Sequence, residues 1–95
     1  MIDIKTSSGF EVRVSERILK DWRVVKALAK VTTGSDEATT VYAMSDVLAL
    51  ILGKDEERLY KHIMALDDEG IVSSENVMNE AKEIIGAIGE AQKNS

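Results

Sequence analysis

An unbroken apolar run at residues 47–52 is the feature of this chain that most constrains its fold. The six residues read Val-Leu-Ala-Leu-Ile-Leu, end at Gly53 and are followed at once by charged residues 54–58. This order is typical of an apolar helix end that passes directly into a second helix, with Gly53 as the C-terminal cap. The run is too short to cross a bilayer, which needs about 20 apolar residues. Its surface must therefore be covered by the rest of the chain or by another protein.

The length and composition predict one small, mostly helical domain over residues 1–95. A chain of 95 residues hides only about 60 to 65% of its unfolded surface, so its core is thin. The absence of cysteine excludes a disulfide framework and a thiolate zinc site. Residues 1–5 lack the basic and then apolar pattern of a signal peptide, which makes the cytoplasm the expected location.

The charge of the chain is unevenly distributed around a net value of −5. Residues 1–31 carry seven Lys/Arg against four Asp/Glu, a net +3, whereas the remainder carries five against thirteen, a net −8. These two regions can close on each other within one molecule or orient identical copies head to tail. Self-association therefore stays open beside the simpler interpretation of two solvated faces.

The periodicity predicts a mainly α fold of the α+β class, with an N-terminal two-stranded hairpin packed on a bundle of about four helices. Alternating apolar residues on both sides of a Gly-containing turn indicate the hairpin over residues 2–14. Helical spacing predicts helices over about 16–31, 40–52, 55–67 and 74–90, with a mobile loop at 32–38.

The expected helix caps are Ser15, Asp55 and either Ser73 or Ser74. In the first helix, Trp22 is expected in the core as part of an apolar stripe. The stripe consists of Ile18, Trp22, Val25 and Ala29, and a basic stripe of Lys20, Arg23, Lys26 and Lys30 is expected on the other side.

No group of residues in the sequence indicates catalysis, a cofactor or a metal site. His62 is the only histidine and has no cysteine or nucleophile-elbow serine to act with, so a structural role is favoured. The acidic residues 67–69 lack the ligand spacing of a calcium loop, and residues 86–89 lack the lysine of a phosphate loop. The prediction is a protein without enzymatic activity.

Soft and amphipathic side chains on the helix flanks are the candidates for a partner-binding surface. Methionine and tyrosine suit adaptable apolar interfaces such as a helix laid in a groove. The candidates are Tyr42, Met44, Leu50, Tyr60, Met64, Met78 and Ile85, with Met78 and Ile85 forming a ridge on the fourth helix.

A winged helix-turn-helix is an alternative for residues 45–72, which predict helix, tight turn, helix and a short extension. The third helix would then enter the major groove of DNA. Its only positive groups are Arg58 and Lys61, which lie among the acidic residues 55–57 and 67–69. Duplex DNA repels such a surface, so a nucleic-acid partner is not expected.

The order of several short motifs resembles that of the tail assembly chaperones of long-tailed (siphovirus-type) bacteriophages and prophages of Gram-positive bacteria. The resemblance covers roughly residues 2–88. Its motifs are Gly9-Phe10-Glu11-Val12, Asp21-Trp22 before Ala27-Leu28-Ala29, Leu50-Ile51-Leu52-Gly53, Arg58-Leu59-Tyr60-Lys61-His62 and Asp68-Glu69-Gly70-Ile71-Val72.

This resemblance implies a non-enzymatic protein of the infected cytoplasm that is absent from the mature virion. Proteins of this family bind the aggregation-prone tape measure protein and help tail tube subunits to polymerise around it. In many of them a ribosomal frameshift adds a C-terminal extension. A structural tail-completion protein is the alternative within phage biology, and it would remain in the finished particle.

Overall fold

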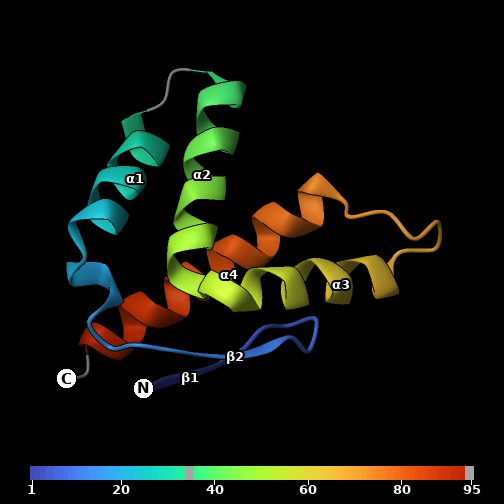
Figure 1. The fold of residues 1–95 in the computed structure, drawn as a ribbon, viewed down its shortest axis with the longest axis horizontal. Coiled ribbons are helices and arrows are strands. Elements are labelled where there is room, and N and C mark those ends of the chain that lie inside the picture. The colour runs from blue at the N-terminus through green and yellow to red at the C-terminus, as the bar shows by residue number, and fades with distance from the viewer. Residues whose placement is uncertain (34–35, 94–95) are drawn as a thin grey trace.

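The computed structural model describes residues 1–33 and 36–93, and it is mainly helical with a two-stranded antiparallel sheet. This confirms the coarser part of the predicted fold class, a mainly α chain with a two-stranded hairpin. The elements follow one another along the chain in the order seen in Figure 1. They are β1 (Ile2–Lys5), β2 (Glu11–Val14), the 3-10 turn η1 (Ile18–Lys20), α1 (Trp22–Thr33), α2 (Glu37–Leu52), the 3-10 turn η2 (Gly53–Asp55), α3 (Glu56–Leu66) and α4 (Ser74–Lys93).

The N-terminal hairpin forms as the alternating pattern predicts. Ile2 pairs with Val14, and Ile4 pairs with Val12. The side chains of Ile4, Val12 and Val14 are buried on one face of the sheet, while their neighbours in each strand are exposed. A two-stranded sheet is marginal in water by itself, so this face has to pack on helices.

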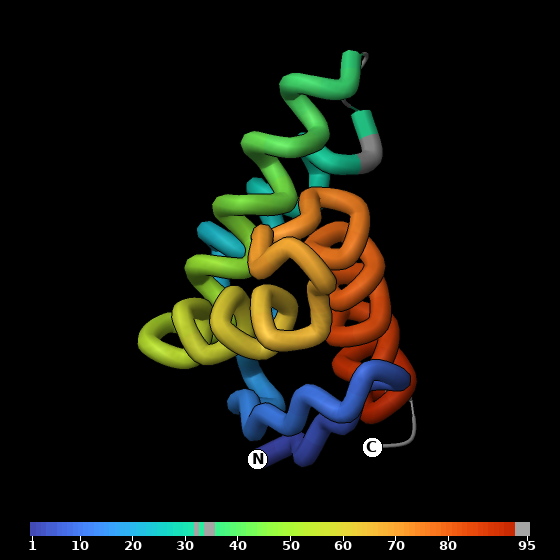
Figure 2. The backbone as a smooth tube through the Cα atoms, turned by 90° about the vertical axis from the view of Figure 1, so that its right-hand side faces the viewer, coloured from blue at the N-terminus to red at the C-terminus, as the bar shows by residue number. Residues whose placement is uncertain are grey.

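The sheet forms a layer beneath α3 and α4, as Figure 2 shows from the side. Phe10 is buried next to β2, and the sheet contributes to one apolar core shared with every α-helix. Fully buried residues from α2, α3 and α4, including Leu48, Leu59 and Ile84, lie at the centre of this core. The hairpin therefore covers one side of the helical core.

The first helix begins six residues later than predicted, at Trp22 rather than residue 16. Ser15 does not cap a helix, because its Oγ accepts from the Arg17 backbone N–H at 3.2 Å within a turn that continues into η1. The helix cap is Asp21, whose Oδ1 accepts from the Arg23 N–H at 2.9 Å. A carboxylate in this position satisfies a backbone donor of the first helical turn.

Trp22 was predicted to lie in the core, but in the structure it is 73% exposed. The residues of α1 that face the core are Val24 and Ala27, with Leu28 and Val31 half-buried. Their spacing of i, i+3, i+4 and i+7 is a regular helical stripe. The prediction that Trp22 and Val25 belong to the core is therefore wrong.

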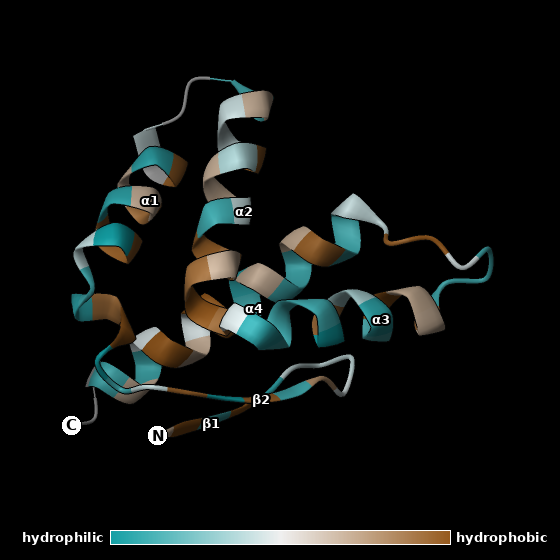
Figure 3. Cartoon of the chain, in the orientation of Figure 1, coloured by the Kyte–Doolittle hydropathy of each residue, from teal (hydrophilic) through white to brown (hydrophobic). Residues whose placement is uncertain are grey.

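The apolar run ends α2 at the predicted place, and Figure 3 shows its hydrophobic C-terminal half against the paler N-terminal half. Gly53 has φ +54° and donates its N–H to the Ala49 carbonyl, so it terminates the helix as predicted. At the other end Asp36 caps the helix by accepting from the Thr39 N–H at 2.7 Å. The second helix therefore starts at Glu37, a few residues before the predicted start.

The last two helices also follow the predicted ranges, with different details at their starts. Asp55 makes no side-chain cap bond to α3 and instead accepts from Arg58 Nη1 at 2.9 Å. Ser73 does cap α4, since its Oγ accepts from the Asn76 N–H at 3.3 Å. The expected mobile loop at 32–38 is shorter, because α1 includes residue 33 and α2 begins at 37, while residues 34–35 lie outside the described part.

The expectation of one bundle of about four helices requires correction, because the helices do not run side by side. In Figure 1, α1 and α2 form an antiparallel arm that stands up from the base, and α3 and α4 run across the foot of α2. The C-terminal half of α2 belongs to the base and its N-terminal half to the arm. The side of α2 next to α4 and the seam between α1 and α2 are therefore two separate surfaces.

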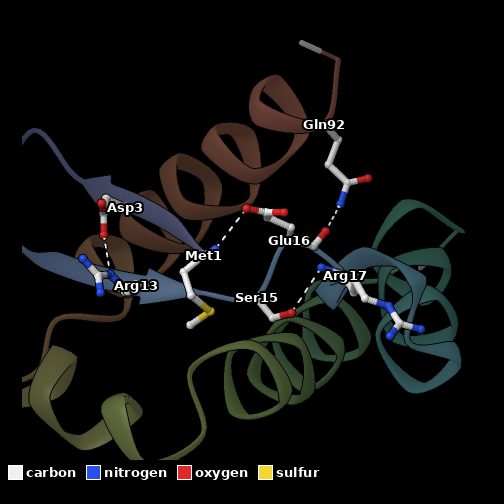
Figure 4. Close-up of polar contacts among 7 residues, drawn as sticks. All are labelled: Met1, Asp3, Arg13, Ser15, Glu16, Arg17 and Gln92. Carbon is white, nitrogen blue, oxygen red and sulfur yellow. Dashed lines mark hydrogen bonds and ion pairs between the residues drawn. The ribbon is translucent and has the colours of Figure 1, made fainter. Parts of the chain in front are cut away.

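Polar contacts tie the two chain ends to the segment between β2 and η1, as Figure 4 shows. The terminal amino group of Met1 lies 2.9 Å from Glu16 Oε1, and the Gln92 amide donates to the Glu16 carbonyl oxygen. On the exposed side of the sheet, Arg13 Nε donates to Asp3 Oδ1 at 2.7 Å. Within the described residues, no helix is long and apolar enough to span a membrane.

Candidate functional site

The candidate site is an apolar groove between the arm and the start of α4. The groove encloses about 230 Å³. Its walls come from the middle of α2, residues 41–48, on one side and from residues 72–78 on the other, with α3 contributing one side chain. The groove residues are Val41, Met44, Ser45, Leu48, Tyr60, Val72, Ser74, Val77 and Met78.

The fold brings together three of the predicted partner-binding residues in this groove. Met44 comes from α2, Tyr60 from α3 and Met78 from α4, so residues from three different helices share one surface. Met44 is buried, whereas Tyr60 and Met78 are half-buried and partly open to solvent. Methionine and tyrosine side chains can adapt to an incoming apolar surface.

The other four predicted residues lie outside the groove. Tyr42 is exposed on the arm, and Met64 is 43% exposed on α3. Ile85 is half-buried and packs against the core, as Met78 also does, but it does not line the groove. Leu50 lines a different hollow, on the α1 side of α2.

Val41 is the most exposed large apolar residue of the groove, and the sequence analysis did not name it as a binding residue. It is 47% exposed at the rim, although it is a β-branched apolar residue. The sequence does not show that residues 72–78 return to this part of α2, so nothing in the local pattern marked Val41 as a binding residue. Val41 becomes part of the groove because residues 72–78, far away in the sequence, form its opposite wall.

Tyr60 sets the polar edge of the groove. Its hydroxyl group donates to Glu56 Oε2 at 3.0 Å, one turn earlier in α3. Burial raises the pKa of Tyr60 above its ordinary value, and the Glu56 carboxylate adds to the shift. The phenol therefore stays neutral at physiological pH and presents its ring to the groove.

A second cluster of polar residues joins the hairpin turn to α3 and α4. Glu80 is only 4% exposed, and its Oε1 accepts from the Ser8 hydroxyl group. Ser8 Oγ also lies 3.0 Å from His62 Nε2 and 3.1 Å from Thr6 Oγ1. Because Ser8 has one hydroxyl hydrogen and gives it to Glu80, His62 Nε2 and Thr6 must be donors to Ser8.

This cluster has the residue types of a catalytic triad in a different order. In a triad the histidine accepts the serine proton and the acid orients the histidine. Here the serine proton points to Glu80, and His62 Nε2 is a donor. The ring of His62 packs 5.6 Å from that of Phe10, centroid to centroid. The arrangement therefore fits a buried structural network that fixes the hairpin turn.

The described residues contain no group of three or more His, Cys, Asp or Glu side chains suited to hold a metal ion. Comparisons with protein-family models, with curated proteins and with solved structures find no match to this chain.

Proposed function

We propose that this protein is a phage tail assembly chaperone that binds the tape measure protein and keeps it soluble while the tail tube assembles. The observation that carries the proposal is the open apolar groove between α2 and α4. It is lined by Met44, Tyr60 and Met78 and has the exposed Val41 at its rim. The motif resemblance supplies the identity of the client.

The dimensions of the groove favour side chains of a protein partner over a free small molecule. A volume of about 230 Å³ lies below the range of roughly 300 to 1,000 Å³ typical of small-molecule pockets. An amphipathic helix needs space only for the anchor residues of one face, which recur at i, i+3 and i+4. A long helical client presents many such faces in succession.

The chemistry of the groove suits a chaperone that must bind segments of varied sequence. Methionine side chains are flexible and polarisable, so they adjust to anchors of different shape. The hydroxyl groups of Ser45 and Ser74, together with the phenol of Tyr60, supply uncharged polar contacts at the edges. Such a surface binds with moderate affinity, which is compatible with release as the tail tube protein takes over the client.

Co-expression of this chain with the tape measure protein of the same phage or prophage genome tests the proposal. We expect the client to move from the insoluble to the soluble fraction and to co-purify with this chain. An insoluble client beside a soluble chaperone would contradict the proposal. Recovery of this chain from purified, finished phage particles would favour the structural tail-completion protein instead.

A further inference from the structure

The opposite side of α2 carries a second hollow, which the groove does not reach. It is an open depression of about 400 Å³ along the seam between α1 and α2. Trp22 stands at this surface with 73% of its area exposed. The hollow is lined by Trp22, Arg23, Lys26, Ala27, Lys30, Asp46, Ala49 and Leu50.

The two walls of this hollow carry opposite charges. The α1 wall presents Lys26 and Lys30, and neither lysine takes part in an ion pair among the described residues. Arg23 is held by Asp21 through contacts of 3.1 and 2.7 Å, so it is largely compensated. The α2 wall presents Asp46. A ligand in the hollow therefore meets two free cations on one side and a carboxylate on the other.

The floor of the hollow is shallow and apolar because the residues along it are small. Ala27 and Ala49 come from facing positions of α1 and α2, and Leu50 continues the apolar surface. Small side chains at a helix pair leave room for the side chains of a third helix to pack into the seam. An exposed Trp at the edge of such a seam is a typical anchor of a protein interface.

We infer that the α1–α2 seam is a second docking surface, which binds an acidic amphipathic helix of another protein. The apolar face of that helix packs on Ala27, Ala49 and Leu50 and covers Trp22. Its Glu or Asp side chains lie beside Lys26 and Lys30. The groove on the other side of α2 remains free, so one molecule can hold two helical segments at once.

The opposite charges of the two walls of the hollow favour binding of an acidic helix over binding of a nucleic acid. A phosphate backbone brings negative charge to both walls and would meet Asp46 across the seam. A helix can place carboxylates on one side only and leave the side next to Asp46 neutral or basic. Trp22 and Leu50 then gain burial from apolar side chains, which a phosphate backbone does not provide.

The single tryptophan provides a direct test, because Trp22 is the only one in the chain. The probe is a synthetic amphipathic helical peptide with leucines on one face and glutamates beside them. A matched peptide carries lysine in place of each glutamate. We expect the glutamate peptide to shift the Trp22 fluorescence emission to shorter wavelength until binding saturates. High salt should weaken this binding, because it screens the lysine–glutamate attraction.

Charge reversal in the whole chain locates the binding. The double substitution Lys26→Glu and Lys30→Glu is expected to lower the affinity for the glutamate peptide by about tenfold or more. The control pair Lys54→Glu and Lys61→Glu changes the net charge equally on exposed residues elsewhere, and we expect it to change the affinity less than about twofold. Circular dichroism checks that each variant is folded.

Several results would overturn the inference. They are the absence of an emission shift, an equal response to the lysine peptide, and an equal loss in the control pair. A blue shift that grows with the concentration of the protein alone would assign the surface to a second copy of this chain. A larger shift with duplex DNA than with the glutamate peptide would assign it to nucleic acid.

Discussion

At the scale of single residues, Glu80 is the buried polar group that matters most, because only its Oε1 is hydrogen-bonded and its buried Oε2 has no partner among the described residues. Glu80 carries a carboxylate into the core, and Ser8 from the hairpin turn donates to it. Burying a carboxylate without donors is costly, so the hydroxyl group of Ser8 matters more than its exposure suggests. The neighbouring Ser7 makes a similar contact to Glu83, but in an exposed position.

Replacing Ser8 by Ala is expected to lower the free energy of unfolding by about 1 to 3 kcal/mol, because the donor to a buried carboxylate is removed. Ser7→Ala is the matched control, and a change within about 0.5 kcal/mol is expected at its exposed site. Urea unfolding followed by circular dichroism measures both. Equal effects of the two substitutions would show that the Ser8 network does not stabilise the fold.

The exposure of Trp22 leads to a second prediction. Leu59 is fully buried, so Leu59→Ala is expected to cost about 2 to 5 kcal/mol. Trp22→Ala is expected to cost less than about 1 kcal/mol, since most of the indole already contacts water. Thermal and urea unfolding compare the two variants. A loss of 3 kcal/mol or more at Trp22, typical of a core aromatic, would contradict its exposed position.

At the scale of elements, the sequence predicted most helices and strands but not the start of α1. The hairpin, the end of α2 at Gly53 and the Ser73 cap follow from local patterns that no distant contact overrides. The start of α1 was predicted from Ser15 alone, whereas Asp21, whose residue type is an equally good cap, is the residue that caps the helix. The stripe of Val24, Ala27, Leu28 and Val31 would have favoured Asp21, since it has the better helical spacing.

The cap at Asp21 predicts a pH dependence. Hydrogen bonds from the Arg23 side chain and backbone lower the pKa of Asp21 to about 2. A carboxyl with a depressed folded-state pKa stabilises the fold above its unfolded pKa of about 3.9, and this contribution is lost as the pH falls towards 2. Between pH 4 and 2 the melting temperature of the wild type should therefore fall more steeply than that of Asp21→Asn.

A melting temperature that changes in parallel for the two proteins over this pH range would show that the Asp21 contact is absent in solution. Asp3→Asn provides a comparison at another exposed ion pair, with Arg13, on the sheet. It tests whether the effect belongs to the helix cap or to any surface carboxylate. The contribution of Asp21 should stand out because its carboxylate also accepts from the helix backbone.

At the scale of the whole molecule, the separation of the arm from the base creates the surfaces that the sequence alone did not reveal. The predicted binding residues were chosen one by one from the helix flanks, and only Met44, Tyr60 and Met78 meet in the groove. Periodicity shows which residues share a helix face, but it does not show which faces meet. The crossing of α2 over α3 and α4 is a tertiary arrangement that the sequence pattern did not predict.

Substitution at the rim of the groove tests most directly whether the client binds there. Val41→Asp places a charge in the groove at a residue that is 47% exposed, so the fold should tolerate it. Met64→Asp is the matched control, because Met64 is 43% exposed and lies on α3 outside the groove. Both variants are co-expressed with the tape measure protein, and the amount of soluble complex is measured.

We predict that Val41→Asp reduces the soluble complex at least about tenfold, because a charge has to be desolvated against an apolar helix. Met64→Asp should leave the complex close to the wild-type level. Circular dichroism of the purified variants verifies that both are folded. Wild-type amounts of complex with folded Val41→Asp, or an equal loss with Met64→Asp, would contradict the assignment of the groove as the client-binding site.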